Sequence, residues 1–284
     1  MRILDTKPNM LPPVVPLVKF DSGAYALDPD ALEWLRQRER PFAVVVGAGK
    51  FRTGKSFLLN RIADNPAGKG FGVGETVQAC TRGIWLSTKP IECETHDVLV
   101  MDTEGIDALD AESQHDVRVF ALAVLLCSVF IYNQMSHLDE AAVQTLSLMT
   151  RVAESVGEAG HAPTLYWVLR DFALQLVDAK GKPITHADYL EQALHPPASK
   201  CATRDAIKSL FPRRHLVTLP RPHKGETAQK IDATLKLNEK FKDYLGKFRA
   251  HLLEHSTPVA AADHTVPGTA GAVPRGAAVR GTGN

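Results

Sequence analysis

Cysteine is scarce in this sequence, and the few cysteines that it has are scattered. The four lie at Cys80, Cys93, Cys127 and Cys201, and no two of them form a C-x-x-C pair. A disulfide framework or a zinc knuckle is therefore not expected. Because reduced thiols are typical of the cytosol, we predict a cytoplasmic protein.

A surplus of charge of either sign is also missing. The chain has 33 Lys and Arg against 32 Asp and Glu, which leaves a formal net charge of +1 over 284 residues. A basic surplus is the electrostatic feature that attracts nucleic acids and anionic membranes. We therefore predict that nucleic acid is not a partner.

Long hydrophobic runs are absent as well. The longest apolar run, residues 119–132, is too short to span a bilayer, and the first five residues lack the apolar core of a signal peptide. The last residues form no prenylation box. These absences predict that the protein does not insert directly into a membrane.

The sequence does contain one strong motif, residues 49–56. Gly-Lys-Phe-Arg-Thr-Gly-Lys-Ser fits G-x-x-x-x-G-K-[ST], the phosphate-binding loop. An apolar run at 42–46 precedes it and a helical pattern at 57–62 follows, so that backbone N–H groups and a helix N-terminus can face the phosphates. We predict that a nucleoside triphosphate is bound by Gly49, Lys50, Phe51, Arg52, Thr53, Gly54, Lys55, Ser56 and Phe57.

Two side chains of this loop have distinct predicted roles. Lys55 is expected to reach the outer phosphates, and the Ser56 hydroxyl is expected to bind Mg²⁺. On sequence alone Lys55 is expected to lie near the ligand rather than in a core. Replacing it with alanine is therefore expected to reduce triphosphate affinity without unfolding the domain.

A second motif, Asp-Thr-Glu-Gly at 102–105, closes an apolar strand at 97–101. An aspartate at the end of a strand can hold hydrated Mg²⁺, and Gly105 lets its backbone N–H approach the γ-phosphate. D-x-x-G alone is usually a turn. Its value here comes from its place after the phosphate-binding loop and after a polar segment at 75–83, which we expect to be a mobile loop carrying a switch threonine.

Strands and helices alternate along most of the chain. This order predicts an α/β protein with the fold of a P-loop GTPase, a central and mostly parallel sheet with helices on both faces. We expect a flexible N-terminus over 1–13, one domain over 14–254 and a low-complexity disordered tail over 255–284. The expected elements are a hairpin at 14–27, a helix after Asp28, strands at 84–86, 127–132, 165–169 and 215–219, and helices at 138–155, 185–194, 203–211 and 227–253.

Two shorter patterns are ambiguous on sequence alone. Arg170 and Asp171 follow the expected strand at 165–169, where ligand groups emerge in doubly wound sheets, but such a pair is commonly a surface salt bridge. His251-Leu-Leu-Glu254-His255 matches the H-x-x-E-H zinc pattern. Since catalytic zinc needs three fixed ligands and no third one is obvious nearby in sequence, we interpret this pattern as a solvated helix end.

Taken together, these motifs resemble the GTPase domain of guanylate-binding proteins, within the dynamin-like group that also includes atlastins. The resemblance spans about residues 14–253. The matching stretches follow in the family's order, at 44–56, 70–85, 102–105, 120–126, 167–172, 183–191, 211–212 and 221–222.

The resemblance implies which base is bound. The sequence has no [NT]-K-x-D guanine motif, and in this family an Arg-Asp pair takes its place. Asp171 would accept hydrogen bonds from guanine N1 and N2, and Arg170 would pack on or near the base. Because adenine lacks these donors, the implied substrate is GTP, with GDP as the product and Mg²⁺ as the cofactor.

The resemblance also implies catalytic roles. Arg52 resembles an arginine finger supplied in cis, which turns onto the phosphates when two GTPase domains meet face to face as a homodimer. Thr81 would close over Mg²⁺ and the γ-phosphate, Glu104 would order the attacking water, and Asp116 would orient the catalytic groups. Arg221 would lie near the guanine-capping region. The implied Mg²⁺ ligands are Ser56, Thr81 and Asp102.

The sequence departs from the family in two places. Ala79 stands where relatives often carry a serine that contacts the attacking water. The alternative function is therefore a GTP-gated interaction module with weak or no hydrolysis. The long helical domain that normally follows the GTPase domain is not in this sequence, so we expect either a fragment or a short variant. An ATPase of generic P-loop type is disfavoured by the Arg-Asp pair.

Overall fold

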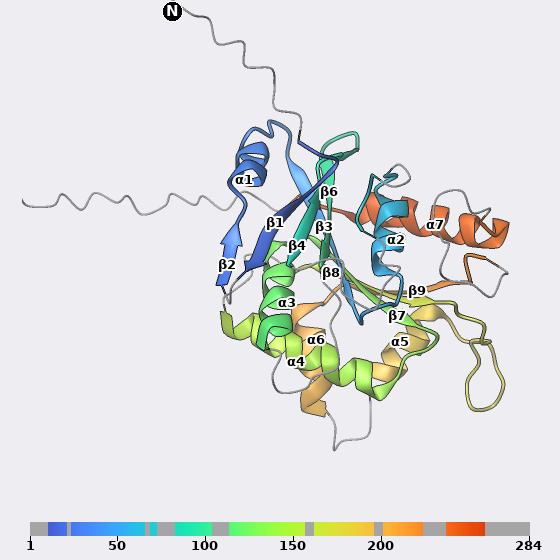
Figure 1. Ribbon diagram of the computed structural model, residues 1–284. Coiled ribbons are helices and arrows are strands. Elements are labelled where there is room, and N and C mark those ends of the chain that lie inside the picture. The colour runs from blue at the N-terminus through green and yellow to red at the C-terminus, as the bar shows by residue number, and fades with distance from the viewer. Residues whose placement is uncertain are drawn as a thin grey trace, which may run out of the picture.

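A single sheet of nine strands organises the described part of the protein (Figure 1). The computed structural model describes residues 11–21, 24–65, 69–72, 83–103, 114–156, 162–195, 201–223 and 237–258. The strands are β1 (Val14–Asp21), β2 (Ala24–Leu27), β3 (Phe42–Gly49), β4 (Ile84–Ser87), β5 (Ile91–Glu92), β6 (Asp97–Thr103), β7 (Val129–Met135), β8 (Thr164–Arg170) and β9 (Arg214–Leu219). The helices are α1 (Pro29–Arg36), α2 (Lys55–Ile62), α3 (Gln114–Leu126), α4 (Glu140–Val156), α5 (His186–Leu194), α6 (Cys201–Leu210) and α7 (Glu239–His255).

The centre of the sheet is parallel. The strand order is β2-β1-β4-β6-β3-β7-β8-β9, and β5 pairs with the free side of part of β6. Strands β6, β3, β7, β8 and β9 run parallel to one another. They are almost entirely apolar and buried, as is usual for parallel strands covered on both faces. The sequence therefore predicted the α/β class and the P-loop GTPase fold correctly.

The chain changes direction across the sheet at β3. After β3 it builds β4 and β6 on one side, and it then crosses to β7, β8 and β9 on the other side. In open α/β sheets, ligands bind outside the carboxyl ends of the strands at such a switch point. The predicted phosphate-binding loop follows directly from the carboxyl end of β3.

Helices cover both faces of this sheet (Figure 1). Side chains from α1, α3, α4, α5 and α6 form one apolar cluster with the sheet, whereas α2 and α7 form the other. The second cluster matters for the site, because it joins the helix after the phosphate loop to the last helix. Phe57 of α2 and Phe241 of α7 have ring centroids 6.1 Å apart.

The antiparallel edge begins with the hairpin expected at 14–27, now seen as β1 and β2. Asp28 caps α1 by accepting hydrogen bonds from the backbone N–H groups of Asp30 and Ala31, as its place before Pro29 predicts. Farther into the sheet, β4 pairs antiparallel with β6, and Trp85 lies directly opposite Asp102.

Two expected boundaries were wrong, and one short strand was not predicted. The strand expected at 127–132 begins only at Val129, because α3 continues to Leu126 and the Cys127 N–H bonds back to the Val124 carbonyl. The last helix begins at Glu239, since Asn238 is not helical and its side chain caps the helix, and residues 227–236 of the expected helix lie outside the described part. The two-residue strand β5 is too short to give a periodic pattern.

Some expectations concern residues outside the described part of the chain. They include most of the N-terminal segment 1–13, most of the tail 255–284 and the polar loop at 75–83. Among the described residues, no helix combines the length and the apolar character that crossing a membrane would require.

Candidate nucleotide-binding site

The phosphate loop, residues 49–56, has a backbone that two glycines make possible. Gly49 has φ = 149°, and a Cβ added there would lie 2.1 Å from the Asn133 carbonyl oxygen. Gly54 has φ = 74° and occupies the N-cap position of α2. Both values are in the region that favours glycine. The loop therefore passes close to β7 and then enters α2 with its backbone N–H groups at the helix N-terminus.

Lys55 and Ser56 meet on one carboxylate. Lys55 Nζ donates to Asp102 Oδ1 at 2.7 Å and also to the Thr103 carbonyl, while the Ser56 hydroxyl donates to Asp102 Oδ2 at 2.6 Å. Asp102 is fully buried and Lys55 is 6% exposed. The structure thus brings the predicted phosphate-binding cation, Lys55, and two of the three predicted Mg²⁺ ligands, Ser56 and Asp102, into one cluster at the ends of β3 and β6.

These oxygen ligands fit a hard divalent cation. Mg²⁺ is usually held by one or two protein oxygens together with phosphate oxygens and waters, so it needs no cage of protein side chains. A carboxylate and a hydroxyl at the carboxyl end of parallel strands supply such oxygens. The described residues contain no group of three or more His, Cys, Asp or Glu that could hold a metal ion by itself.

A contact between β7 and the phosphate loop was missed by the sequence analysis. The Asn133 side-chain amide donates to both the Thr53 carbonyl, at 3.0 Å, and the Thr53 hydroxyl, at 2.8 Å. The Thr53 hydroxyl in turn donates to the Lys50 carbonyl at 2.8 Å. The available signal was a polar Asn inside an apolar strand near its carboxyl end, where ligand-site residues gather.

Arg52 lies on the outer side of the same loop. It is exposed, and its backbone has φ = 62°, which is uncommon for a residue other than glycine. Its guanidinium carbon lies 5.4 Å from the centroid of the Phe51 ring. The side chain therefore projects from the loop rather than packing beneath it.

Arg170 and Asp171 differ sharply in their surroundings. Arg170, at the end of β8, is 3% exposed and donates to the Gly54 carbonyl at 2.9 Å. Burial lowers the pKa of Arg170 to about 10, and the nearby Asp171 opposes that shift. Asp171 has φ = 55°, and its carboxylate accepts a hydrogen bond from Arg221 Nε at 3.2 Å.

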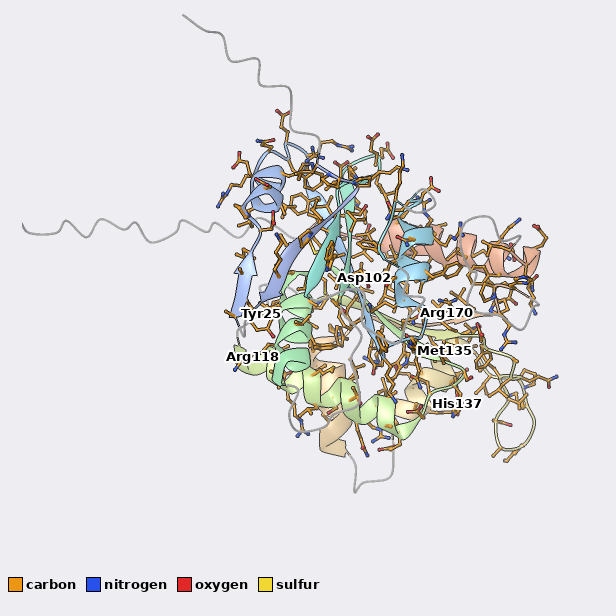
Figure 2. All side chains as sticks on the ribbon, in the orientation of Figure 1. Tyr25, Asp102, Arg118, Met135, His137 and Arg170 are labelled. Atoms are coloured by element: carbon orange, nitrogen blue, oxygen red, sulfur yellow. The ribbon has the colours of Figure 1, made fainter. Side chains whose placement is uncertain are left out.

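Figure 2 labels Asp102 and Arg170 at the ends of β6 and β8, on the two strands that flank the site beside α2. The structure thus collects the phosphate loop, Asp102, Arg170, Asp171 and Arg221 around the carboxyl edge of the parallel sheet. This is the edge that the sequence motifs predicted.

Several predicted site residues lie outside the described residues. They are Thr81, Glu104 and Gly105, together with Ala79, the position that departs from the family. Asp116 lies within α3, but its side chain is also outside the described part. Their roles remain predictions.

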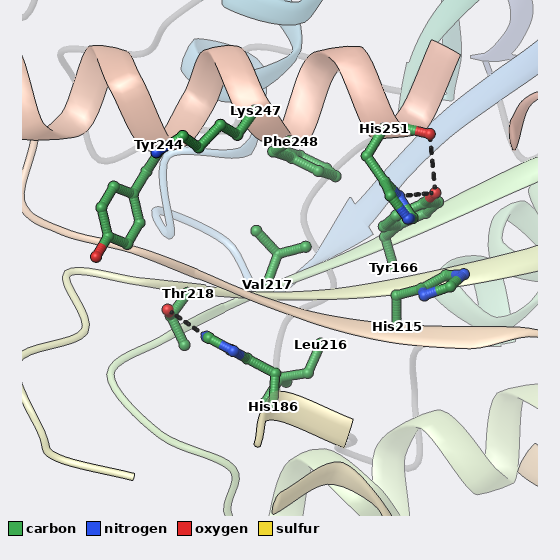
Figure 3. Close-up of a pocket in the computed structure, with 10 residues that line it drawn as sticks. All are labelled: Tyr166, His186, His215, Leu216, Val217, Thr218, Tyr244, Lys247, Phe248 and His251. Carbon is green, nitrogen blue, oxygen red and sulfur yellow. Dashed lines mark hydrogen bonds between the residues drawn. The ribbon is translucent and has the colours of Figure 1, made fainter. Parts of the chain in front are cut away.

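A separate groove of about 350 Å³ lies along β9, between the start of α5 and α7 (Figure 3). Its lining includes Tyr166, His215 and His251 but none of the residues predicted to bind nucleotide. The Tyr166 hydroxyl is 2.8 Å from His251 Nδ1. His215 lies next to His251, the first histidine of the H-x-x-E-H pattern, and the centroids of the two rings are 4.9 Å apart.

The rings of this histidine group are partly engaged in contacts within the protein. The His251 and His255 rings stack with centroids 4.1 Å apart, and Nδ1 of each ring is already engaged, one by Tyr166 and the other by the His251 carbonyl. No metal-binding group was found among the residues that the structure describes. Because none of its lining residues is predicted to bind nucleotide, the groove is distinct from the phosphate site.

Comparison with known proteins agrees with this geometry. The family model described as "Guanylate-binding protein, N-terminal domain" matches residues 22–260. The chain is 32% identical over 268 residues to guanylate-binding protein 2 of Mus musculus, covering 85% of this chain and 45% of that protein. It is 31% identical over 281 residues to guanylate-binding protein 6 of Homo sapiens, covering 89% of this chain and 44% of that protein.

A third relative, guanylate-binding protein 3 of Mus musculus, is 37% identical over 221 residues, which cover 68% of this chain and 34% of that protein. The chain therefore spans less than half the length of these curated relatives. With a family model over most of the chain, a sheet of the expected topology and a phosphate loop at its switch point, this chain belongs to the guanylate-binding protein family.

Proposed function

We propose that this chain binds GTP with Mg²⁺ and hydrolyses it to GDP and phosphate. One observation carries the proposal: Lys55 and Ser56 converge on the buried carboxylate of Asp102 at the sheet's switch point. A cation for phosphate oxygens, a hydroxyl for the metal and a carboxylate for the metal's waters are the parts that phosphoryl transfer requires. Membership of the guanylate-binding protein family supports guanine as the base.

Each described residue has a chemical task in this proposal. Ser56 and Asp102 hold Mg²⁺, which neutralises charge on the phosphate oxygens when it is bound. The backbone N–H groups at the start of α2 hold the phosphates, with Lys55 adding a positive charge. Asp171 accepts the guanine N1–H and N2–H donors, and an adenine nucleotide, which lacks these donors, forgoes both hydrogen bonds.

Hydrolysis is coupled to homodimerisation in this proposal. Arg52 projects from the phosphate loop and is exposed, so a second copy docked on this face could press its side chain toward the transferring phosphoryl group. An arginine that reaches this group raises the rate by about 10³–10⁵. The proposed dimer surface is the side of the protein at the carboxyl edge of the sheet, where Arg52 is exposed. The other proposed catalytic residues are Thr81, Glu104 and Asp116.

A second candidate is a GTP-gated interaction module that binds GTP and dimerises but turns over poorly. The observation that favours it is Ala79, because alanine has no hydroxyl to contact the attacking water. The two functions predict the same GTP affinity and differ in turnover. The proposed domain, residues 14–254, is the same in both.

Phosphate release from GTP, measured with Mg²⁺ at several protein concentrations, tests the proposal. The expected result is a specific activity that rises with protein concentration and falls strongly in Arg52→Ala. Arg36→Ala, which removes an exposed arginine on α1, is the matched control and should leave the activity unchanged. GTP binding without phosphate release would support the interaction module, and absence of GTP binding would refute both.

Binding assays with GTP, GDP, GMP and ATP, with product analysis, complete the test. Preference for guanine nucleotides and release of GDP support the proposed reaction. Equal affinity for ATP would contradict the assignment of Asp171 to the base.

A further inference from the structure

Arg170 is a buried cation in an unusual setting. Its side chain is 3% exposed, and its Nε has no hydrogen-bond partner. Within the described ranges, no carboxylate forms an ion pair with its guanidinium, while the neighbouring Asp171 pairs with Arg221 instead. Burying a charge without an opposite charge is costly, so its retention points to a specific task.

The guanidinium acts on one peptide group of the phosphate loop. The Gly54 carbonyl accepts two hydrogen bonds, one from the Leu58 N–H at 3.0 Å and one from Arg170 at 2.9 Å. That carbonyl shares its peptide group with the Lys55 N–H, which lies in the phosphate loop. Hydrogen bonds in a chain polarise one another, so a charged donor on this carbonyl strengthens the Lys55 N–H as a donor to an anion.

The same guanidinium is also in contact with α7. Its central carbon lies 5.4 Å from the Phe57 ring centroid and 5.8 Å from that of Phe241, both within the range of cation–π attraction. Phe57 belongs to α2 and is 5% exposed, while Phe241 belongs to α7 and is fully buried. Arg170 therefore joins β8, the phosphate loop and the last described helix.

We propose that Arg170 is a positioning residue that sets the affinity of the phosphate loop for the phosphates, and that Phe241 makes this affinity depend on the docking of α7. The proposal rests on the function proposed above and differs from the sequence-based expectation that Arg170 packs on the base. A side chain that is 3% exposed offers almost no surface to a base. In this proposal Asp171, and not Arg170, selects the base.

Dissociation constants for GTP and GMP separate the two roles, because GMP keeps the guanine base but lacks the outer phosphates. Arg170→Met keeps the length and apolar volume of the side chain but removes the charged donor. We expect it to weaken GTP binding by about tenfold to a hundredfold and to change GMP binding much less. Asp171→Asn, in contrast, should weaken the binding of both nucleotides, because both carry the base.

Arg204→Met is the matched control for losing a buried arginine. Arg204 is 4% exposed, pairs with Glu140 at 2.6 Å and lies on α6, on the other face of the sheet. We expect it to lower the midpoint of thermal unfolding without changing either dissociation constant. If Arg170→Met behaved in the same way, its role would be structural and the proposal would be wrong.

Phe241→Leu tests the contribution of α7 and also covers the case in which Arg170→Met does not fold. It removes the ring beside the guanidinium and leaves the bond to Gly54 intact. A smaller loss of GTP affinity, with little change for GMP, is expected, and unchanged GTP affinity would refute the link to α7. An equal loss of GTP and GMP affinity in Arg170→Met would indicate a contact with the base and refute the proposal, whereas failure of the wild type to bind GTP would refute the proposed function itself.

Discussion

Asp171 has a backbone conformation that narrows the choice of test substitutions. Its φ of 55° is tolerated by Asn as well as by Asp, so Asp171→Asn keeps the turn and changes only the acceptor. We expect the variant to bind GTP more weakly by about 1–3 kcal/mol, because buried guanine donors lose a charged partner. Titrations with GTP and ATP measure the change in both affinities.

Arg221→Ala is the companion to that experiment. Arg221 is well exposed and contacts the Asp171 carboxylate at 3.2 Å, so its removal tests whether the guanidinium holds that carboxylate in place. The expected loss of GTP affinity is smaller than in Asp171→Asn. If Asp171→Asn kept the full preference for GTP over ATP, Asp171 would not be the base-selecting residue.

The burial of Lys55 changes the effect that we expect from substituting it. The sequence suggested a lysine that could be removed without harm to the fold, but the structure buries it against the fully buried Asp102. Removing one partner of a buried ion pair leaves the other charge uncompensated. We expect Lys55→Met to lower the free energy of unfolding by about 3–5 kcal/mol as well as to weaken triphosphate binding.

Chemical denaturation of Lys55→Met and of the double variant Lys55→Met/Asp102→Asn measures that effect. The double variant should recover part of the lost stability, because the remaining side chain is neutral. It should not recover nucleotide binding. A single variant as stable as the wild type would show that the ion pair contributes little to folding.

At the scale of elements, α7 contacts the sheet through histidines in addition to its apolar cluster. His215 on β9 lies close to His251 on α7, and the Tyr166 hydroxyl on β8 is hydrogen-bonded to His251 (Figure 3). His215 also lies close to His255 on the same helix. Burial, followed by the two neighbouring histidines, lowers the pKa of His215. Burial and then His255 lower the pKa of His251, while Glu254 on the same helix opposes that shift.

These shifts fix the sign of the pH dependence. In the unfolded chain both histidines titrate near 6.5, whereas in the fold they titrate below that value. The unfolded state therefore binds more protons as the pH falls through about 6.5, and the domain loses stability there. We expect the thermal midpoint to fall between pH 7.5 and pH 5.5.

His215→Phe should reduce this fall, because phenylalanine keeps the stacked contact with Tyr166 but takes up no proton. His137→Gln, which replaces an exposed histidine, is the control. An identical pH profile in His215→Phe and the wild type would mean that other groups cause the loss of stability.

Local sequence signals predicted most elements but not all of their ends. The capping residues Asp28 and Thr185 mark helix starts that the structure confirms, because capping depends on neighbours within three or four residues. The start of α7 was wrong, since the structure places it at Glu239, after the non-helical Asn238. The Asn238 cap was present in the sequence, but Asn is also common in helical interiors and turns.

At the scale of the whole molecule, what the sequence missed are contacts between distant segments. Asn133 meets Thr53 across 80 positions, and Arg170 meets Gly54 across 116. Motif spacing reports on the residues inside a motif, so it identified the loop and Asp102. The Arg-Asp pair, in contrast, was assigned only through the family resemblance, since its position alone was ambiguous. Motif spacing carries no information on which strand neighbours the loop, because that is set by the order of strands in the sheet.

The register between β4 and β6 has a practical consequence for spectroscopy. Residues directly opposite in an antiparallel pair point to the same face with Cβ atoms about 5 Å apart, so the half-buried Trp85 lies beside the carboxylate of Asp102. The other two tryptophans are Trp34 on α1 and Trp167, which is fully buried in β8 and bonded to Gln134.

The protein therefore contains an intrinsic fluorophore next to its proposed metal and phosphate site. Binding of Mg²⁺ and GTP should alter the emission of Trp85 without any attached dye. Trp85→Phe should abolish most of the change, whereas Trp34→Phe should preserve it. A stopped-flow trace of this signal would then time the arrival of nucleotide at the site directly, in unlabelled protein.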